Sequence, residues 1–413
     1  MNVEAAFDLE RVRADFPILS QEVNGRPLVY LDNGATTQVP GAVLDAVVAH
    51  YRADNANVHR GIHTLSERST AKLEAAREAV AAFLGAASAD EVVFTSGTTA
   101  SVNMVARAWE ERLAPGAAVV VTALEHHANF VPWQQACART GAEFFVCPLD
   151  DAGDVDAAAL EARLAAGGVS LVAVAHVSNV LGTVVPVRDV ARMAHRHGAA
   201  VLVDAAQSAR HEPLDVRGID CDFLCLSGHK VLGPTGIGVL YGKKGLLEEL
   251  QPSCYGGEMV AQVSSARTTF EPPPLRFEAG TPNYVGAIGL AAALAYLDGV
   301  GRDAVAGWEA ALMAYAEERL RAVSGVRVLG APARRAGCLS FSVEGAQPFD
   351  VAALMDKLGV AVRSGTQCAQ PLLDETLGVP KVVRVSPAFY NTREEIDACA
   401  AALERVVPLV SRP

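Results

Sequence analysis

Short apolar runs alternate with longer amphipathic stretches along most of the chain. The runs are rich in Val, Leu and Ala, which predicts buried strands, and the stretches between them predict helices. The predicted strands lie at 91–94, 119–122, 143–146, 171–174, 200–203, 223–226 and 239–241. Strands that alternate with helices in this way are typical of a mostly parallel sheet covered by helices on both faces. The pattern therefore predicts an α/β fold.

The alternation is interrupted at residues 251–280, a segment rich in Gly, Pro and Thr that predicts an extended hairpin or loop. A helix near 286–297 follows, and then a second group of helices and strands reaches the end of the chain. We expect a large domain at residues 25–298. We expect a smaller α/β domain formed by residues 1–24 together with 299–413.

Composition narrows the class of protein. The net charge of −12 over 413 residues argues against a general nucleic-acid surface. No apolar run approaches the length that spans a membrane, and the acidic start of the chain predicts no signal peptide. The eight cysteines are scattered without a disulfide pattern or a zinc spacing, so we expect a cytoplasmic protein with no metal site.

Polar side chains follow the predicted strands, at the points where the strands end. They are Thr98, His126, Asn179, Asp204, Gln207, Ser227 and Lys230. Because parallel strands end at one edge of their sheet, and open α/β sheets bind ligands there, these residues predict a site along that edge.

Taken singly, each of these residues has an ordinary explanation. Lys230 follows a buried strand, where a lowered amine pKa would suit covalent chemistry with a carbonyl, but a lone lysine more often extends to solvent. Thr98 begins a predicted helix, where it would cap the helix or help to hold a phosphate. His126 and His127 allow a zinc site but lack a third ligand. Asp204 is either an N-cap or the partner of a cation.

Taken together, these residues favour pyridoxal phosphate. This cofactor needs a lysine that bonds covalently to its aldehyde and an acid that pairs with its pyridinium nitrogen. It also needs a group of hydrogen-bond donors that binds its phosphate. A dinucleotide site is disfavoured because the first strand–helix turn lacks the glycine fingerprint, and the phosphate-binding P-loop motif is absent as well.

The chain resembles the SUF-type (group II) cysteine desulfurases of the class V aminotransferase family. The resemblance rests on YLDNGATTQVP, VHRGIHTLSE, FTSGTTASVN, EHHANFVPWQ, HVSNVLGT, VDAAQSA, SGHKVLGPTGIGVLY, RFEAGTPN, RSGTQCAQPLL and VRVSPAFYNT. These segments run in the family's order from about residue 28 to residue 391. The resemblance implies a fold-type I pyridoxal-phosphate-dependent transferase that forms a homodimer.

The resemblance also implies individual roles. Lys230 would bind the cofactor covalently and move the substrate Cα proton, and Cys368 would be the nucleophile. Around the cofactor, His126 would stack on the ring, Asp204 would pair with the pyridinium nitrogen and Gln207 would bond the phenolic oxygen. The residues implied for the phosphate are Thr98, Ser227, His229 and, from the other subunit, Thr281. Those implied for the substrate are Arg384, which would bind its carboxylate, Asn179, Arg363 and, at the entrance, His59 and Arg60.

Two positions depart from the family pattern. SUF-type members commonly carry two histidines, or Gln-His, before the nucleophile, whereas this chain has Thr366 and Gln367. A proton donor is therefore missing beside Cys368. Cys254 lies in CYGG, where the family often has a longer glycine run, and it adds a second candidate thiol.

The predicted reaction converts L-cysteine to L-alanine and leaves a persulfide on Cys368. Its sulfur would supply iron–sulfur cluster assembly through an acceptor protein of the SufE or SufU type. One alternative is a selenocysteine lyase, or a desulfurase that supplies another sulfur pathway. An alternative of another class is a pyridoxal-phosphate-binding sulfur-carrier scaffold without turnover.

Overall fold

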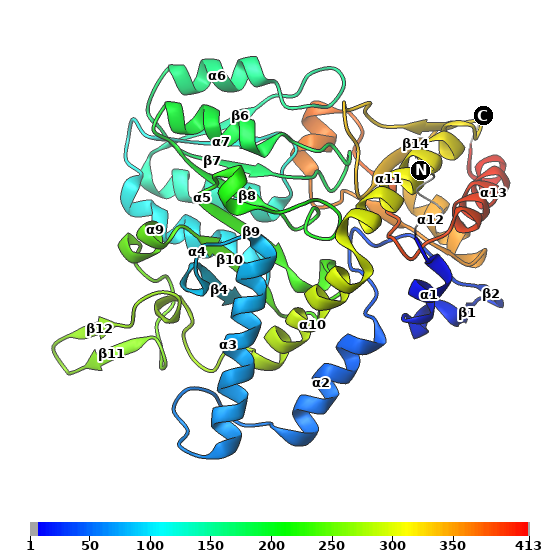
Figure 1. The fold of residues 1–413 in the computed structure, drawn as a ribbon. Helices are drawn as coiled ribbons and strands as arrows, with labels where there is room; N and C mark the ends of the chain where they lie inside the picture. The colour runs from blue at the N-terminus through cyan, green and yellow to red at the C-terminus, as the bar shows by residue number, and fades with distance from the viewer. Residues whose placement is uncertain (1–6, 412–413) are drawn as a thin grey trace.

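A seven-stranded sheet forms the centre of the larger part of the molecule (Figure 1). The structure is a computed structural model and describes residues 7–411. In spatial order the strands are β4 (Val92–Thr95), β10 (Gly238–Gly242), β9 (Phe223–Ser227), β8 (Ala200–Asp204), β7 (Val169–Ala175), β5 (Ala118–Thr122) and β6 (Glu143–Cys147). β10 runs antiparallel to both of its neighbours, and the other adjacent pairs are parallel. The predicted mostly parallel α/β sheet is confirmed.

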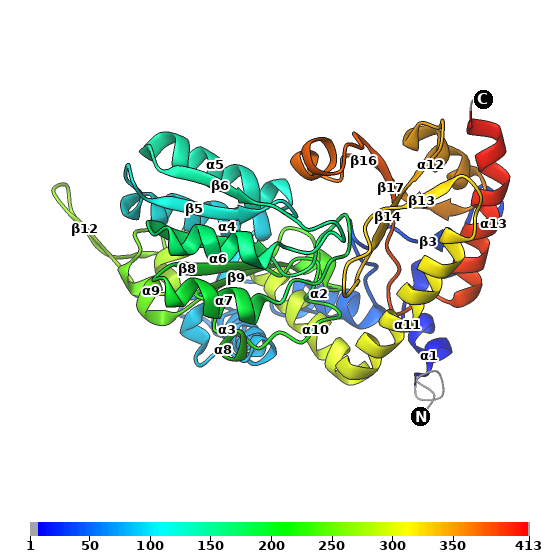
Figure 2. The ribbon, with the colours of Figure 1, turned by 90° about the horizontal axis from the view of Figure 1, so that it is seen from above.

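Successive residues along these strands face two different apolar cores, because side chains alternate across a sheet. In β8, Val201 and Val203 belong to one core and Leu202 to the other. The first core is covered by α3 (Thr64–Leu84), α6 (Ala157–Ala165), α7 (Val187–Arg196) and α10 (Tyr284–Val300). The second core is covered by α4 (Thr98–Trp109), α5 (His127–Thr140) and α9 (Lys244–Glu249). Figure 2 shows helices along both sides of the sheet.

A four-stranded antiparallel sheet organises the smaller part of the molecule. Its strands, in spatial order, are β13 (Val326–Val328), β14 (Leu339–Val343), β17 (Val382–Val385) and β16 (Arg363–Gly365). The helices beside it are α11 (Arg302–Arg321), α12 (Pro348–Lys357) and α13 (Arg393–Val410). α13 begins with a capping box, in which Thr392 and Glu395 each bond the other's backbone.

The start of the chain crosses between the two parts. α1 (Leu9–Ala14) ends before Pro17, and a short hairpin of β1 (Glu22–Val23) and β2 (Arg26–Pro27) follows. β3 (Val29–Tyr30) then pairs in parallel with β15 (Val360–Ala361). This pairing places the turn after β3 beside the C-terminal sheet, where it reaches the site described below.

The remaining elements lie along one side of the large part. α2 (Gly41–Ala53) packs on α10, and the hairpin of β11 (Val260–Val263) and β12 (Thr268–Phe270) projects from the body (Figure 1). α8 (Val216–Ile219) packs near α7. α3 begins at Thr64, because the His63 ring accepts the Ser66 N–H and caps the helix. Among the helices of residues 7–411, none alone is long and apolar enough to cross a membrane; only α10 and α11 together, bent by 79°, reach that length and composition.

Candidate active site

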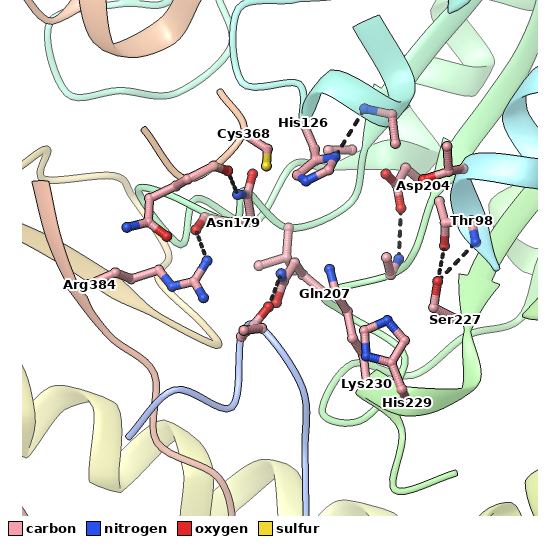
Figure 3. A pocket seen from close by; sticks show the side chains of 18 of the residues that line it. Thr98, His126, Asn179, Asp204, Gln207, Ser227, His229, Lys230, Cys368 and Arg384 are labelled. Carbon is pink, nitrogen blue, oxygen red and sulfur yellow. Dashed lines mark hydrogen bonds between the residues drawn. The ribbon is translucent and has the colours of Figure 1, made fainter. Parts of the chain in front are cut away.

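A cavity of about 260 Å³ lies where the carboxyl ends of the large-sheet strands meet the small sheet. Two distant parts of the sequence contribute its walls (Figure 3). From the large part come Thr98, His126, Asn179, Asp204, Gln207, Ser227, His229 and Lys230, and from the C-terminal part come Arg363, Gln367, Cys368 and Arg384. The structure therefore brings together all but three of the residues expected to contact cofactor or substrate.

Among residues 7–411, Lys230 is the lysine that lines this cavity (Figure 3). It ends a short 3-10 turn, Gly228–Lys230, directly after β9. Its Nζ forms no hydrogen bond or ion pair with any residue that the structure describes. Burial lowers the pKa of this amine, and the nearby Asp204 opposes the shift. A partly buried amine with a lowered pKa is suited to attack a carbonyl carbon.

Asp204 ends β8 and is buried beside the same cavity. Its Oδ1 accepts the Ala206 N–H at 2.8 Å, so the other carboxylate oxygen remains available to a ligand. Burial raises the pKa of Asp204, while the Ala206 bond and Lys230 act in the opposite direction. A cation bound here would stabilise the ionised carboxylate.

The N-terminus of α4 opens onto the cavity near Ser227. Gly97 is the N-cap residue and provides no side-chain cap, so the first N–H groups of the helix are directed towards the site. Ser227 Oγ accepts the Thr98 N–H at 2.9 Å and lies 2.9 Å from Thr98 Oγ1. Two hydroxyls and a helix N-terminus form a ready site for a phosphate.

His126 is the N-cap of α5, and its Nδ1 accepts the Ala128 N–H at 3.0 Å. Burial, reinforced by Lys230, lowers the pKa of His126 to about 3, so the ring is neutral at physiological pH. Its neighbour Glu125 is buried and accepts hydrogen bonds from Thr122, Asn129 and the Ala175 N–H. Burial raises the pKa of Glu125 to about 7. Glu125 thus links β5, β7 and α5.

Asp32 is a residue of the site that the sequence interpretation missed. Its Oδ1 accepts a bond from Arg384 Nη2 at 3.0 Å, and its Oδ2 lies 3.3 Å from Arg363 Nη1. Arg384 also donates to the Asn179 carbonyl at 3.1 Å. The carboxylate therefore orients two arginines, and a planar guanidinium held in this way suits an α-carboxylate. Its place in the YLDNGATT turn was the signal that could have identified it.

Three hydrogen bonds hold the loop that carries Cys368. The Cys368 carbonyl accepts the His127 N–H at 2.7 Å, and His127 Nε2 accepts the Gln370 N–H at 3.1 Å. Asn179 Nδ2 donates to the Gln367 carbonyl at 2.6 Å. The Cys368 side chain remains exposed and faces the cavity (Figure 3). His127, considered earlier as a metal ligand, instead anchors this loop.

Gln367 directly precedes Cys368, the expected nucleophile. Its side chain is buried, and neither Nε2 nor Oε1 has a hydrogen-bond partner among the described residues. Gln367 and Cys368 both have φ of +53°, a left-handed conformation that is uncommon for residues other than glycine. A left-handed conformation costs a residue other than glycine about 1–3 kcal/mol, so the backbone of this loop is strained beside Cys368.

Three predicted site residues lie outside this cavity in the single chain. His59 pairs with Glu74 at 3.1 Å, and Arg60 pairs with Glu258 at 3.2 Å. Thr281 is exposed, away from the cavity of its own chain. The second candidate thiol, Cys254, is exposed and is absent from the cavity wall. Within residues 7–411, no group of three or more His, Cys, Asp or Glu side chains is placed to hold a metal ion.

Comparison with known proteins assigns the family. Residues 29–399 match the aminotransferase class-V family. The chain belongs to that family. A cysteine desulfurase of Serratia proteamaculans is 46% identical over 98% of this chain and 100% of its own length. The chain is therefore a relative of the cysteine desulfurases within the class-V aminotransferases, as the sequence motifs indicated.

Other similar proteins share the fold but differ in length. A cysteine desulfurase of Synechococcus elongatus is 47% identical over 97% of this chain, but the chain spans only 64% of that protein's length. The crystal structure of the cysteine desulfurase CsdA from Escherichia coli has a TM-score of 0.90 and 40% identity, and covers 98% of this chain and 99% of its own. The fold is thus that of the fold-type I pyridoxal phosphate enzymes.

The residues of the cavity fit pyridoxal phosphate. The free amine of Lys230, the open oxygen of Asp204 and the uncapped start of α4 match its aldehyde, its ring nitrogen and its phosphate. Gln207 donates one amide N–H to the Gly34 carbonyl at 2.8 Å, which leaves its second N–H for the cofactor's phenolic oxygen. His126 lines the same cavity, as a residue stacked on the ring must.

Proposed function

We propose that the protein is a cysteine desulfurase that converts L-cysteine to L-alanine and holds the released sulfur as a persulfide on Cys368. The observation that carries this proposal is an exposed cysteine on the wall of the cavity that also contains Lys230, Asp204 and Arg384. A transaminase needs no thiol there, whereas sulfur transfer does. The similar proteins named above support the same reaction.

Some side chains of the cavity bind the substrate or the cofactor, and others transfer protons. Arg384, oriented by Asp32, binds the substrate carboxylate, and this interaction directs the substrate thiol towards the Cys368 loop. Bound pyridoxal phosphate supplies an electron sink for the substrate Cα, and Asp204 keeps its ring nitrogen protonated. Lys230, with its lowered amine pKa, accepts the Cα proton and returns a proton later. His126 remains neutral and packs beside the reacting centre.

Sulfur transfer requires the thiolate form of Cys368, which attacks the substrate sulfur. A new S–S bond forms as the Cβ–S bond breaks, so that cysteine and one protein thiol yield alanine and one persulfide. Gln367 is close to this event, but an amide cannot release a proton at neutral pH as an imidazole can. Proton delivery to the product therefore falls to Lys230 or to water.

The proposal is tested by mass spectrometry of the holoenzyme after treatment with L-cysteine. We expect one added sulfur on Cys368 of the wild type and none on C368S, because a hydroxyl is a poor sulfur nucleophile. C368S should retain cofactor absorbance and should respond spectrally to cysteine, whereas K230A should release no alanine. A sulfur adduct on Cys254 in place of Cys368 would refute the assignment of the nucleophile. Alanine release without any adduct would show direct discharge of the sulfur, as in a lyase.

We further infer a homodimer, a cytoplasmic location and a sulfur-acceptor protein of the SufE or SufU type, with iron–sulfur cluster assembly as the pathway. The eight cysteines, all within the described residues, are free, which supports a reducing compartment. Thr281 is exposed in the single chain and is available to complete the phosphate site of a second copy. The division at residues 25–298 against 1–24 and 299–413 is proposed as the boundary of the two domains.

A further inference from the structure

The side chain of Glu125 is buried where three elements of the large part of the molecule meet. Its Oε1 accepts the Thr122 hydroxyl at 2.5 Å and the Ala175 N–H at 3.0 Å. Its Oε2 accepts the Asn129 amide at 2.6 Å. These partners belong to β5, β7 and α5, and none of them carries a charge. Burying a carboxylate among neutral groups is costly, yet no step of the proposed reaction uses Glu125.

The hydrogen bonds around Glu125 have a fixed direction. The indole Nε1 of Trp133 can only donate, and it donates to Asn129 Oδ1 at 3.2 Å. This bond turns Asn129 Nδ2 towards Glu125. The Ala175 backbone N–H also can only donate. Glu125 therefore has to accept on both of its oxygens, which a carboxylate does and the amide of a glutamine, with one oxygen, cannot do.

These bonds lie next to the cofactor cavity. Glu125 directly precedes His126, the N-cap residue of α5, and Ala175 is the last residue of β7. Both His126 and Ala175 line the cavity. The carboxylate thus joins the two stretches of backbone that carry these wall residues. Because the network continues to Asn129 and Trp133 in the first two turns of α5, it fixes the start of the helix as well.

We propose that Glu125 is a positioning residue for the desulfurase reaction. Its hydrogen bonds hold the end of β7 and the start of α5 together, and so keep Ala175 and His126 in place on the wall where pyridoxal phosphate binds. This role rests on the proposed function. The substrate carboxylate is left to Arg384, which Asp32 orients separately. Loss of the Glu125 bonds should therefore reduce cofactor affinity and kcat, and should leave the KM for cysteine nearly unchanged.

The test exchanges donor and acceptor between positions 125 and 129. In E125Q the introduced N–H faces the Asn129 N–H, and if the Asn129 amide turns round it faces the Trp133 N–H instead. No orientation of the two amides pairs all the donors. In E125Q/N129D the carboxylate at position 129 offers one oxygen to the amide at position 125 and the other to Trp133. Every bond is then restored, and the charge moves from position 125 to position 129.

Burial raises the pKa of Glu125 to about 7, so the measurements are made at about pH 8.5, where the carboxylate is ionised. In E125Q we expect the Kd of the apoprotein for pyridoxal phosphate to rise about tenfold and kcat to fall about tenfold, the effect of one unpaired buried group. The KM for cysteine should stay within about twofold of the wild type. E125Q/N129D should return Kd and kcat to within about threefold of the wild type. E143Q is the matched control, because Glu143 is exposed and bonds Arg163.

Cofactor affinity does not depend on turnover, so it tests Glu125 even if the protein releases no alanine and the proposed function fails. If E125Q does not fold, the double variant alone decides: wild-type Kd and kcat support the positioning role, and a tenfold loss of either contradicts it. Wild-type Kd and kcat in E125Q would overturn the proposal. A double variant as impaired as E125Q would overturn it too, because the site would then depend on the charge at position 125 and not on its hydrogen bonds.

Discussion

At the scale of single residues, the chemistry depends on close packing around Arg384. Gly34 lies in the turn after β3, and a Cβ built there would be 3.1 Å from Arg384 Cζ and 3.2 Å from Ser386 Oγ. Both distances are tighter than ordinary contacts, and Arg384 is further held by Asp32 and by the Asn179 carbonyl. The absence of a side chain at Gly34 therefore allows the guanidinium to line the cavity, where the proposed function places the substrate carboxylate.

G34A should displace the Arg384 guanidinium by a few tenths of an ångström. We expect the KM for cysteine to rise about tenfold, because a bidentate charge-assisted contact depends on its geometry. Cofactor absorbance should be retained, since Lys230 and Asp204 are untouched. G245A is the control, because a Cβ at Gly245 would meet nothing within 4 Å. An unchanged KM in G34A would show that Arg384 does not bind the substrate carboxylate.

At the scale of elements, the N-terminus of α5 and the Cys368 loop form one unit. His126 and His127 are adjacent in sequence but act differently: the first lines the cofactor cavity, and the second accepts the Gln370 N–H through Nε2. Burial lowers the pKa of His127, so Nε2 remains able to accept this bond at neutral pH. The bond is lost only as the pH falls through that lowered pKa and the ring becomes charged. Helix α5 thus holds both the cofactor side and the nucleophile side of the site.

H127A should loosen the Cys368 loop without altering the cofactor site. We expect persulfide formation on Cys368 to slow about fivefold, the equivalent of one neutral hydrogen bond. The rate is measured by quenching at intervals and mass spectrometry, and cofactor binding is followed by absorbance. H197A is the control, because His197 bonds Glu161 on the surface. If H127A loses the cofactor or forms persulfide at the wild-type rate, the anchoring role is wrong.

At the scale of the whole molecule, an apolar face remains uncovered in the single chain. On α2, Leu44, Val48 and Tyr51 are 50%, 42% and 58% exposed, and their spacing places them on one side of the helix. Ile62 and Leu65, near the start of α3, are also exposed. An exposed apolar face of this kind is typical of an interface between proteins. A second copy of the chain is the occupant that the proposed homodimer requires.

L44E combined with V48E should therefore convert the dimer into monomers. We expect sedimentation velocity to show the shift and cofactor affinity to fall with it, because Thr281 would no longer reach the phosphate of the other subunit. L409E is the control, since Leu409 is 74% exposed, even more than Leu44 and Val48, but lies on α13. Wild-type holoenzyme that sediments as a monomer would refute the dimer, and a dimeric double variant would exclude this face as the interface.

The sequence by itself determined the α/β fold, the family and the residues at the strand ends. Periodicity and strand-end chemistry are local properties, so Asp204, Ser227 and Lys230 could be assigned without coordinates. Only the tertiary structure revealed the antiparallel β10, the Asp32–Arg384 pair and the anchoring role of His127. Each depends on contacts between distant segments, some separated by more than 200 residues. The burial of the Gln367 amide without a hydrogen-bond partner among residues 7–411 is likewise set by packing, because burial and missing partners cannot be read from residue order.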